Sequence, residues 1–178
     1  MDQMFGFTAI FNLDISNWDV SNVTIMEDMF ERTEAFNIDI SGWNVSSVTT
    51  MEDMFRRSVV FNQDISDWDV SNVTNMDDMF EDAEVFDQDL GSWNVANVNS
   101  MSDMFTGSLS TENYDALLEG WSQLTLQNGV TLDVGDVAYC ATDARQSIID
   151  TFGWTINDGD ESTDCSSDFA PFVTTWAI

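Results

Sequence analysis

The sequence predicts an α/β fold, a right-handed solenoid of 25-residue coils, each with one strand and one short helix, closed by a C-terminal cap. Its period is the main reason: the phrase Met-x-x-Met-Phe begins again at Met1, Met26, Met51, Met76 and Met101. All ten methionines belong to these pairs, and four of the seven tryptophans share one repeat position, at Trp18, Trp43, Trp68 and Trp93. A fixed period of this length is typical of stacked units that bury their apolar faces only against their neighbours.

Within each unit the periodicity changes. Asp64-Ile65-Ser66 alternates polar and apolar residues, which favours a short strand with only Ile65 inward. Met76, Met79 and Phe80 then follow at helical spacing. Three Thr/acid pairs resemble helix capping boxes, namely Thr24/Glu27, Thr49/Glu52 and Thr74/Asp77. This is leucine-rich-repeat organisation with Met, Phe and Trp in the places of leucine, and it predicts two inward columns: the four tryptophans, and Ile15, Ile40, Ile65 and Leu90.

The chain after Thr106 loses the period and is predicted to form the cap, because the last coil would otherwise expose its apolar flank. A helix should follow Ser110, with Tyr114 to Trp121 at helical spacing and Gly120 near its end. Residues 130–134 alternate as a short strand. A second helix should run from about Thr142 to a stop at Gly153, and residues 154–156 should add an edge strand.

The expected domain organisation follows from these shifts. Residues 1–105 form the repeat solenoid, with four full repeats and the start of a fifth, and 106–158 form the cap. Residues 159–178 are expected to be a polar linker and, from Phe169 to Ile178, the start of a further domain. Because the chain opens inside a repeat, we expect it to be a piece of a longer protein.

The charge is extreme, with 33 acidic against 4 basic residues, no histidine and a net charge of −29. Such a field repels phosphate backbones and anionic lipid headgroups, which argues against nucleic-acid and membrane-surface binding, and it favours cations and basic partners. The sequence has no apolar run of about 18 residues, so no membrane insertion is expected. An apolar share of 43% is enough for a packed core.

The phrase Phe-Asn-x-Asp-Ile-Ser-x-Trp-Asp-Val-Ser-Asn-Val-Thr-x-Met-x-x-Met-Phe resembles the repeat of BspA-like leucine-rich-repeat surface proteins of bacteria. The closing segment is also similar to that family, in Leu109-Ser-Thr-Glu-Asn-Tyr-Asp-Ala-Leu-Leu-Glu-Gly-Trp121 and Ala144-Arg-Gln-Ser-Ile-Ile-Asp-Thr-Phe-Gly-Trp-Thr-Ile156. Phe7, Ile10 and Asp87 depart from the pattern. The resemblance covers roughly residues 1–158, and it implies secretion, cell-surface display and adhesion or partner binding, with no enzymatic activity.

Two cysteines, Cys140 and Cys165, are the only ones in the chain. In an exported protein two cysteines favour a disulfide, which would stabilise the fold by roughly 3–4 kcal/mol in the chain-entropy model. Two unpaired thiols are the alternative. A zinc site is disfavoured because two thiolates without histidine do not complete one.

The carboxylates are the candidate functional groups, and Asp14, Asp39, Asp64 and Asp89 occupy one position in four units. Their repetition argues against catalysis, because an active site is normally singular; the sequence also lacks a histidine base, and the enzyme prediction is negative. Two interpretations of this column remain open. Each carboxylate accepts hydrogen bonds from nearby backbone amides, or neighbouring carboxylates bind structural calcium as the one conceivable cofactor.

Two further columns are predicted to be structural. Asn12, Asn37 and Asn62 should form an amide ladder. The alternating charges of Glu31, Arg56 and Glu81, with Arg32, Arg57 and Asp82 beside them, suggest ion pairs between neighbouring coils, each worth about 0–1 kcal/mol if exposed.

The sequence therefore predicts a non-catalytic extracellular binding or adhesion module of a larger bacterial surface protein, acting through an acidic repeat surface on a protein or glycan partner. The candidate binding residues are predicted to lie on a strand-lined face: Gln63, Asp64, Ser66, Asp67, Asp14, Asp39 and Asp89. A purely structural spacer or stalk is the first alternative, and a polysaccharide-active enzyme is the second, because acidic residues alone never exclude a glycosidase pair. The oligomeric state and the identity of the ligand stay open.

Overall fold

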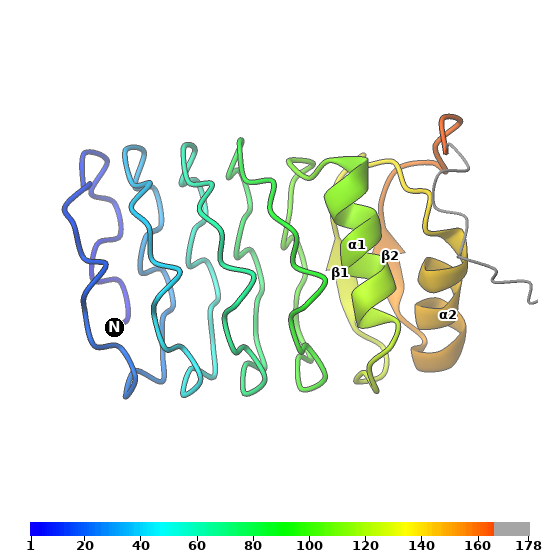
Figure 1. The fold of residues 1–178 in the computed structure, drawn as a ribbon, viewed down its shortest axis with the longest axis horizontal. Helices are drawn as coiled ribbons and strands as arrows, with labels where there is room; N and C mark the ends of the chain where they lie inside the picture. The colour runs from blue at the N-terminus through cyan, green and yellow to red at the C-terminus, as the bar shows by residue number, and fades with distance from the viewer. Residues whose placement is uncertain (166–178) are drawn as a thin grey trace, which may run out of the picture.

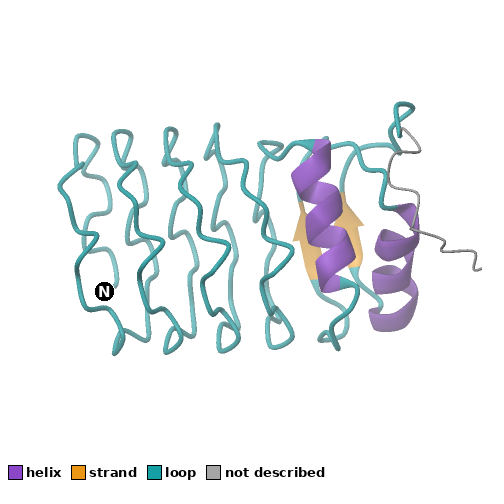
Figure 2. Ribbon diagram, in the orientation of Figure 1, coloured by secondary structure: helices purple, strands orange, loops and turns teal. Residues whose placement is uncertain are grey.

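A computed structural model describes residues 1–165, so the predicted further domain at 169–178 lies outside the described residues. Regular secondary structure is confined to the C-terminal part of the described chain (Figures 1 and 2). Its elements are helix α1 (Thr111–Trp121), strand β1 (Thr131–Asp133), helix α2 (Thr142–Phe152) and strand β2 (Thr155–Asn157). The two strands pair in parallel, with Thr131 opposite Thr155.

The predicted fold class, a leucine-rich-repeat-like α/β solenoid of strand–helix coils, is wrong. Residues 1–110 contain no helix and no strand, and their β-pairing is limited to isolated parallel bridges such as Ile25–Thr50, Thr50–Asn75 and Asn75–Ser100. Each Met-x-x-Met-Phe stretch is a series of turns instead of a helix. The 25-residue units do lie side by side in order along the long axis (Figure 1).

The hydrogen bonding explains why no helix forms. In the stretch 26–32 every second amide donates to the neighbouring unit: Asp28, Phe30 and Arg32 donate to the carbonyl oxygens of Glu52, Met54 and Arg56, at 3.0, 2.9 and 2.7 Å. The amides in between close tight turns, as in Met29 to Met26. Asp28 and Arg32 have φ angles of 52° and 57°, which an α-helix excludes. The same left-handed pair recurs in the later units.

The predicted capping boxes and the short strand are therefore also wrong. Thr49 does not cap a helix; its amide and hydroxyl both donate to the carbonyl oxygen of Thr24 in the unit before, at 2.8 and 3.0 Å. Ile65, the centre of the expected strand, lies in irregular chain, where the Asp64 carboxylate binds the backbone in a local turn. In both places a polar side chain binds neighbouring backbone, which competes with regular structure.

The interior is a set of stacked apolar columns. The rings of Phe30, Phe55, Phe80 and Phe105 follow one another at 5.5, 5.6 and 5.4 Å between centroids, nearly parallel. Eight methionines from Met26 to Met104 and seven phenylalanines from Phe30 to Phe105 are at most 1% exposed. This stacking supplies the apolar burial that an isolated unit lacks. The predicted inward column of Ile15, Ile40, Ile65 and Leu90 is confirmed by burial, with 2% or less of each residue exposed.

The tryptophan column is buried from Trp43 onward, while Trp18 at the open end is 38% exposed. Each buried indole N–H donates across to the carbonyl oxygen 28 residues earlier, so that Trp68 reaches Ile40 at 3.2 Å. Trp121 of α1 continues the series by donating to Leu90 at 3.1 Å. The tryptophans are thus core residues that also satisfy buried backbone oxygens.

The cap elements follow the sequence closely. Helix α1 begins after Ser110, whose side chain accepts a hydrogen bond from the Asn113 amide, and α2 ends at Gly153 with φ 66°. The predicted strands appear as β1 and β2, within one or two residues of the expected bounds. Cys140 and Cys165 are joined in a disulfide. No helix in the described part of the chain is both long and apolar enough to span a bilayer.

The last unit and the cap meet on two sides. Phe105 donates its amide to Asp133 of β1, whereas α1 lies against the stretch around Gly91 on the opposite side (Figure 1). A Cβ on Gly120 would sit 2.0 Å from the Gly91 carbonyl oxygen. Helix and turn therefore approach so closely that only glycine fits.

We predict that Trp68→Ala lowers the unfolding free energy by about 3–5 kcal/mol, because it removes a fully packed indole and leaves a cavity. Trp68→Phe should cost less, since it removes the hydrogen bond to Ile40 but keeps most of the ring. Urea denaturation measures both. The matched control is Trp18→Ala, at the same repeat position but part-exposed; an equal cost at Trp18 would show that stacking does not decide the effect.

We also predict that Gly120→Ala destabilises by roughly 1–3 kcal/mol or more, because helix α1 must move away from Gly91. Gly42→Ala is the control, since a Cβ there meets nothing within 4 Å. Thermal unfolding compares the two variants. Equal melting temperatures would contradict the close approach of α1 to the last unit.

Candidate functional site

The four repeated aspartates, here called the acidic row, are Asp14, Asp39, Asp64 and Asp89. In each, the carboxylate Oδ1 accepts the backbone amide two residues on, at 3.0, 3.0, 3.0 and 2.8 Å. The Ser16 and Ser66 hydroxyls add a second bond to the same oxygen, both at 2.7 Å. The local backbone thus fixes the orientation of each carboxylate, as the first of the two interpretations predicts.

For three of these aspartates the hydrogen bonds also stabilise the ionised form of the carboxylate. The serine hydroxyl and then the serine amide lower the pKa of Asp14, Asp39 and Asp64 below the ordinary value of an aspartate. All four side chains are exposed. The second oxygen, Oδ2, accepts no hydrogen bond from any described residue of the chain, so each carboxylate offers one free, charged oxygen to solvent.

The structure brings most of the candidate binding residues together. Asp39, Ser41, Gln63, Asp64 and Asp67 line one open hollow of about 310 Å³ between two units. Gln63 is held in place by donating to the Asn37 side chain at 2.8 Å. Ser66 is used by Asp64, and Asp14 and Asp89 extend the row on either side without lining this hollow.

The expected strand-lined face is wrong for these residues. The bridges run instead through the stretches 25–32, 50–57, 75–82 and 100–107, which continue into β1; we call this surface the bridged face. The acidic row belongs to the opposite side, where α1 packs, because the stretch around Gly91 meets α1.

The predicted amide ladder is present, but it joins side chains to backbone. Asn37 Oδ1 accepts the amide of Asn62 at 3.0 Å, and Asn62 Oδ1 accepts that of Asp87 at 3.0 Å. Asp87 then accepts the Ser110 amide and hydroxyl at 2.8 and 2.9 Å. Asp87, which stands where the other units have Asn, therefore places a carboxylate at the N-terminus of α1, where negative charge is favourable. This change of residue type is the sequence signal that could have indicated the contact.

Carboxylates on the bridged face have the opposite electrostatics. Burial and the neighbouring Asp53 raise the pKa of Asp78 to about 6. Burial likewise raises the pKa of Glu52, with Glu27 adding repulsion, and burial raises the pKa of Asp53 and Glu31. Burial first, and then the like charges of neighbouring units, make the charged form costly here.

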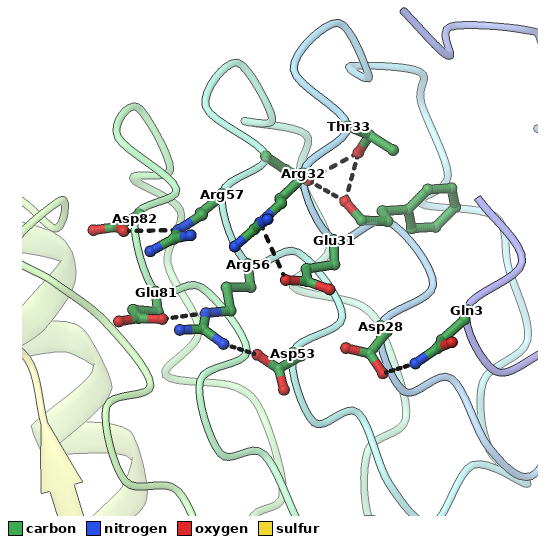
Figure 3. Close-up of polar contacts among 12 residues, drawn as sticks. Gln3, Asp28, Glu31, Arg32, Thr33, Asp53, Arg56, Arg57, Glu81 and Asp82 are labelled. Carbon is green, nitrogen blue, oxygen red and sulfur yellow. Dashed lines mark hydrogen bonds and ion pairs between the residues drawn. The ribbon is translucent and has the colours of Figure 1, made fainter. Parts of the chain in front are cut away.

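The arginines relieve part of that repulsion (Figure 3). Arg56 pairs with Asp53 at 3.1 Å and with Glu81 of the next unit, and Arg57 pairs with Asp82 at 3.2 Å. The Arg56–Glu81 and Arg57–Asp82 pairs are predicted pairs between units, whereas Arg56 and Asp53 belong to one unit. Arg32 differs, because it pairs with Glu31 of its own unit at 3.4 Å and covers the Phe7 ring.

One polar cluster was not foreseen. Arg145 of α2 donates twice to Asp158, at 2.7 Å to each oxygen, and the Tyr114 hydroxyl donates to the same carboxylate at 2.7 Å. Burial, together with the bond to Asp158, raises the pKa of Tyr114, so the phenol stays neutral. The cluster ties α1 and α2 to the chain after β2. Its residues are spread over 45 positions of sequence without a motif.

Within residues 1–165, no three His, Cys, Asp or Glu side chains gather in a group suited to a metal ion. The calcium interpretation of Asp14, Asp39, Asp64 and Asp89 therefore gains no geometric support, while the backbone interpretation has four hydrogen bonds in its favour.

We predict opposite effects of pH for two matched substitutions. The folded pKa of Asp78 is above its ordinary value, so its contribution to stability is present at pH below about 4 and is lost as pH rises through about 6. Asp78→Asn should therefore stabilise at pH 7.5 by about 1 kcal/mol after allowance for solvent screening, with a difference that shrinks towards pH 4. Asparagine also tolerates the positive φ of 56°.

Asp64→Asn should behave in the opposite way. Its folded pKa is lowered, so its stabilisation is present above the ordinary aspartate pKa and is lost as pH falls through the lower folded value. The variant should be less stable than the parent at pH 7.5 and equal to it in strong acid. Urea titrations across pH test the pair, and the same sign for both substitutions at pH 7.5 would contradict the assignment.

Comparisons with known proteins give one match. The family model described as Mycoplasma protein of unknown function, DUF285, matches residues 1–121. No curated protein and no solved structure matches the chain. Since the match covers all the Met-x-x-Met-Phe units and helix α1, the chain belongs to the DUF285 family.

Proposed function

We propose that the chain is a non-catalytic binding module of a larger bacterial surface protein, and that the acidic row is its binding surface. The observation that carries the proposal is the fixed geometry of Asp14, Asp39, Asp64 and Asp89, each with Oδ1 bound by its own backbone and Oδ2 free. A carboxylate that is already oriented loses little conformational entropy when a partner binds.

The partner that fits is a protein or glycan with cationic groups at regular spacing. The stacked phenylalanine rings repeat every 5.4 to 5.6 Å, which sets the step from one unit to the next. Charges held at such a step on a molecule of net charge −29 attract basic partners from a distance and fix their register. The hollow beside Gln63 and Asp67 would receive one basic side chain.

Two observations support a place outside the cell. The Cys140–Cys165 disulfide is a bond that oxidising compartments favour. The repeat phrase resembles that of BspA-like surface proteins, which are displayed on the cell surface and take part in adhesion. Both supports concern location, and neither identifies the partner.

The first alternative is a spacer that holds other domains away from the surface. The hydrogen bonds inside each Asx turn favour it, because they explain the repeated geometry of the acidic row without any partner. A polysaccharide-active enzyme remains the second alternative. Every carboxylate of the row has equivalents in neighbouring units, which argues against a single catalytic pair.

The test is an array of extracellular-matrix proteins and glycans, probed with the folded chain at about 0.15 M salt, where the Debye length is roughly 8 Å. The variant replaces the four carboxylates of the row by Asn, which keeps Oδ1 for the turn and removes only the charge. We predict binding to at least one component, weakened about tenfold or more in the variant.

The matched control removes four exposed charges elsewhere, by Glu34→Gln, Glu84→Gln, Glu119→Gln and Asp150→Asn. It has the same net charge as the row variant and should bind as the parent does. Equal losses in both variants would reduce the effect to net charge. A chain that binds no component would favour the spacer instead.

A further inference from the structure

The first unit leaves an apolar surface at the open end of the stack. Six of the eight exposed large hydrophobic residues of the described chain lie between Met4 and Ile25. They are Met4, Phe7, Ile10, Leu13, Trp18 and Ile25. At the other end, α1 and β1 cover the last unit (Figure 1), so this end alone is uncovered among residues 1–165.

Two of these positions, those of Met4 and Trp18, are buried when a unit lies in front of them. Met4 is half-exposed, whereas Met29, Met54, Met79 and Met104 at its repeat position are fully buried. Trp18 stands in the same relation to Trp43. The open end is thus one half of the interface that recurs inside the molecule between each unit and the next.

The backbone at this end has a direction. Gln3, Phe5 and Phe7 donate their amides onward to Glu27, Met29 and Glu31, at 2.9, 3.1 and 2.7 Å. The carbonyl oxygens of Asp2 and Met4, which correspond to those of Glu27 and Met29, accept no hydrogen bond from the described chain. The end therefore presents backbone acceptors beside apolar side chains. A partner with backbone amide donors and apolar side chains would complement it.

A second copy of the chain does not meet this requirement. Two open ends placed face to face would set carbonyl oxygens against carbonyl oxygens on the bridged face. The donor side of the last unit, at Phe105, is already used by Asp133 of β1. Head-to-tail stacking of two copies is therefore blocked by the cap.

We propose that the open end is a docking surface for one further Met-x-x-Met-Phe unit, aligned in parallel and in the register of the internal units. The amides that correspond to Asp53 and Phe55 would donate to the carbonyl oxygens of Asp2 and Met4. The two methionines and the phenylalanine of the added unit would cover Met4, Phe5 and Trp18. This surface is separate from the acidic row and does not depend on its function.

The test places a copy of residues 51–75 directly before Met1, so that the copied Asn75 precedes Met1 as Asn75 precedes Met76. Amide exchange of the copied Asp53, Phe55 and Arg57 is followed by NMR. We predict at least 100-fold slower exchange than in a control extension that carries Met51→Ser, Met54→Ser and Phe55→Ser in the copy, together with a higher melting temperature.

Equal exchange in the two extended proteins would overturn the proposal. The unextended chain is also examined by sedimentation over a wide concentration range. Self-association that the extension abolishes would make a second copy the occupant of this surface, which would likewise overturn it. A monomer whose extension becomes protected supports it, and an acidic-row variant should leave the protection unchanged.

Discussion

Every unit in this protein depends on backbone amides that it gives to the next unit. Asp28 donates to Glu52, and Asp53 donates to Asp77, at 3.0 and 2.9 Å. A buried amide must find an acceptor, and here the acceptor lies in a neighbouring unit instead of one helical turn away. The turns, the left-handed residues and the stacked phenylalanines all follow from this choice. An isolated unit would lose both its hydrogen bonds and its apolar contacts.

The stacking has an electrostatic consequence, because a charge that recurs in successive units lies beside its equivalent in the next unit. Two arrangements of the repeated charges occur. In the acidic row the carboxylates are exposed to solvent and hydrogen-bonded by serine donors, as at Asp64. On the bridged face the carboxylates are partly buried, and Arg56 offsets the repulsion between Asp53 and Glu81. The first arrangement suits recognition of a basic partner, and the second makes the fold sensitive to pH.

Sequence patterns predicted the local features best. The helix start at Ser110, the stop at Gly153 and the buried columns of Ile65 and Trp68 could be read directly, because short-range signals decide them. The helix expected at Met76–Phe80 could not form, although its spacing fits one. Turns also place i and i+3 on one side, and the positive φ positions carry Asp78 and Asp82 where a glycine would have indicated a turn.

In the candidate site, the acidic row itself was predictable from its period. The hollow at Gln63 and the cluster around Asp158 were not, because they join residues from different units or elements.

Native-state amide exchange of the unextended chain tests the lateral hydrogen bonds most directly. If amides are given to the next unit, then Asp53, Phe55 and Arg57 should be protected together with Met54, Arg56 and Ser58, which close the turns, while Glu52, with no acceptor in the described chain, exchanges fast. Destabilising the following unit, by Phe80→Ala, should speed exchange at Asp53, Phe55 and Arg57 more than at the turn amides. Continuous protection through residues 51–57 that survives Phe80→Ala would indicate a local helix and would contradict the lateral hydrogen bonding.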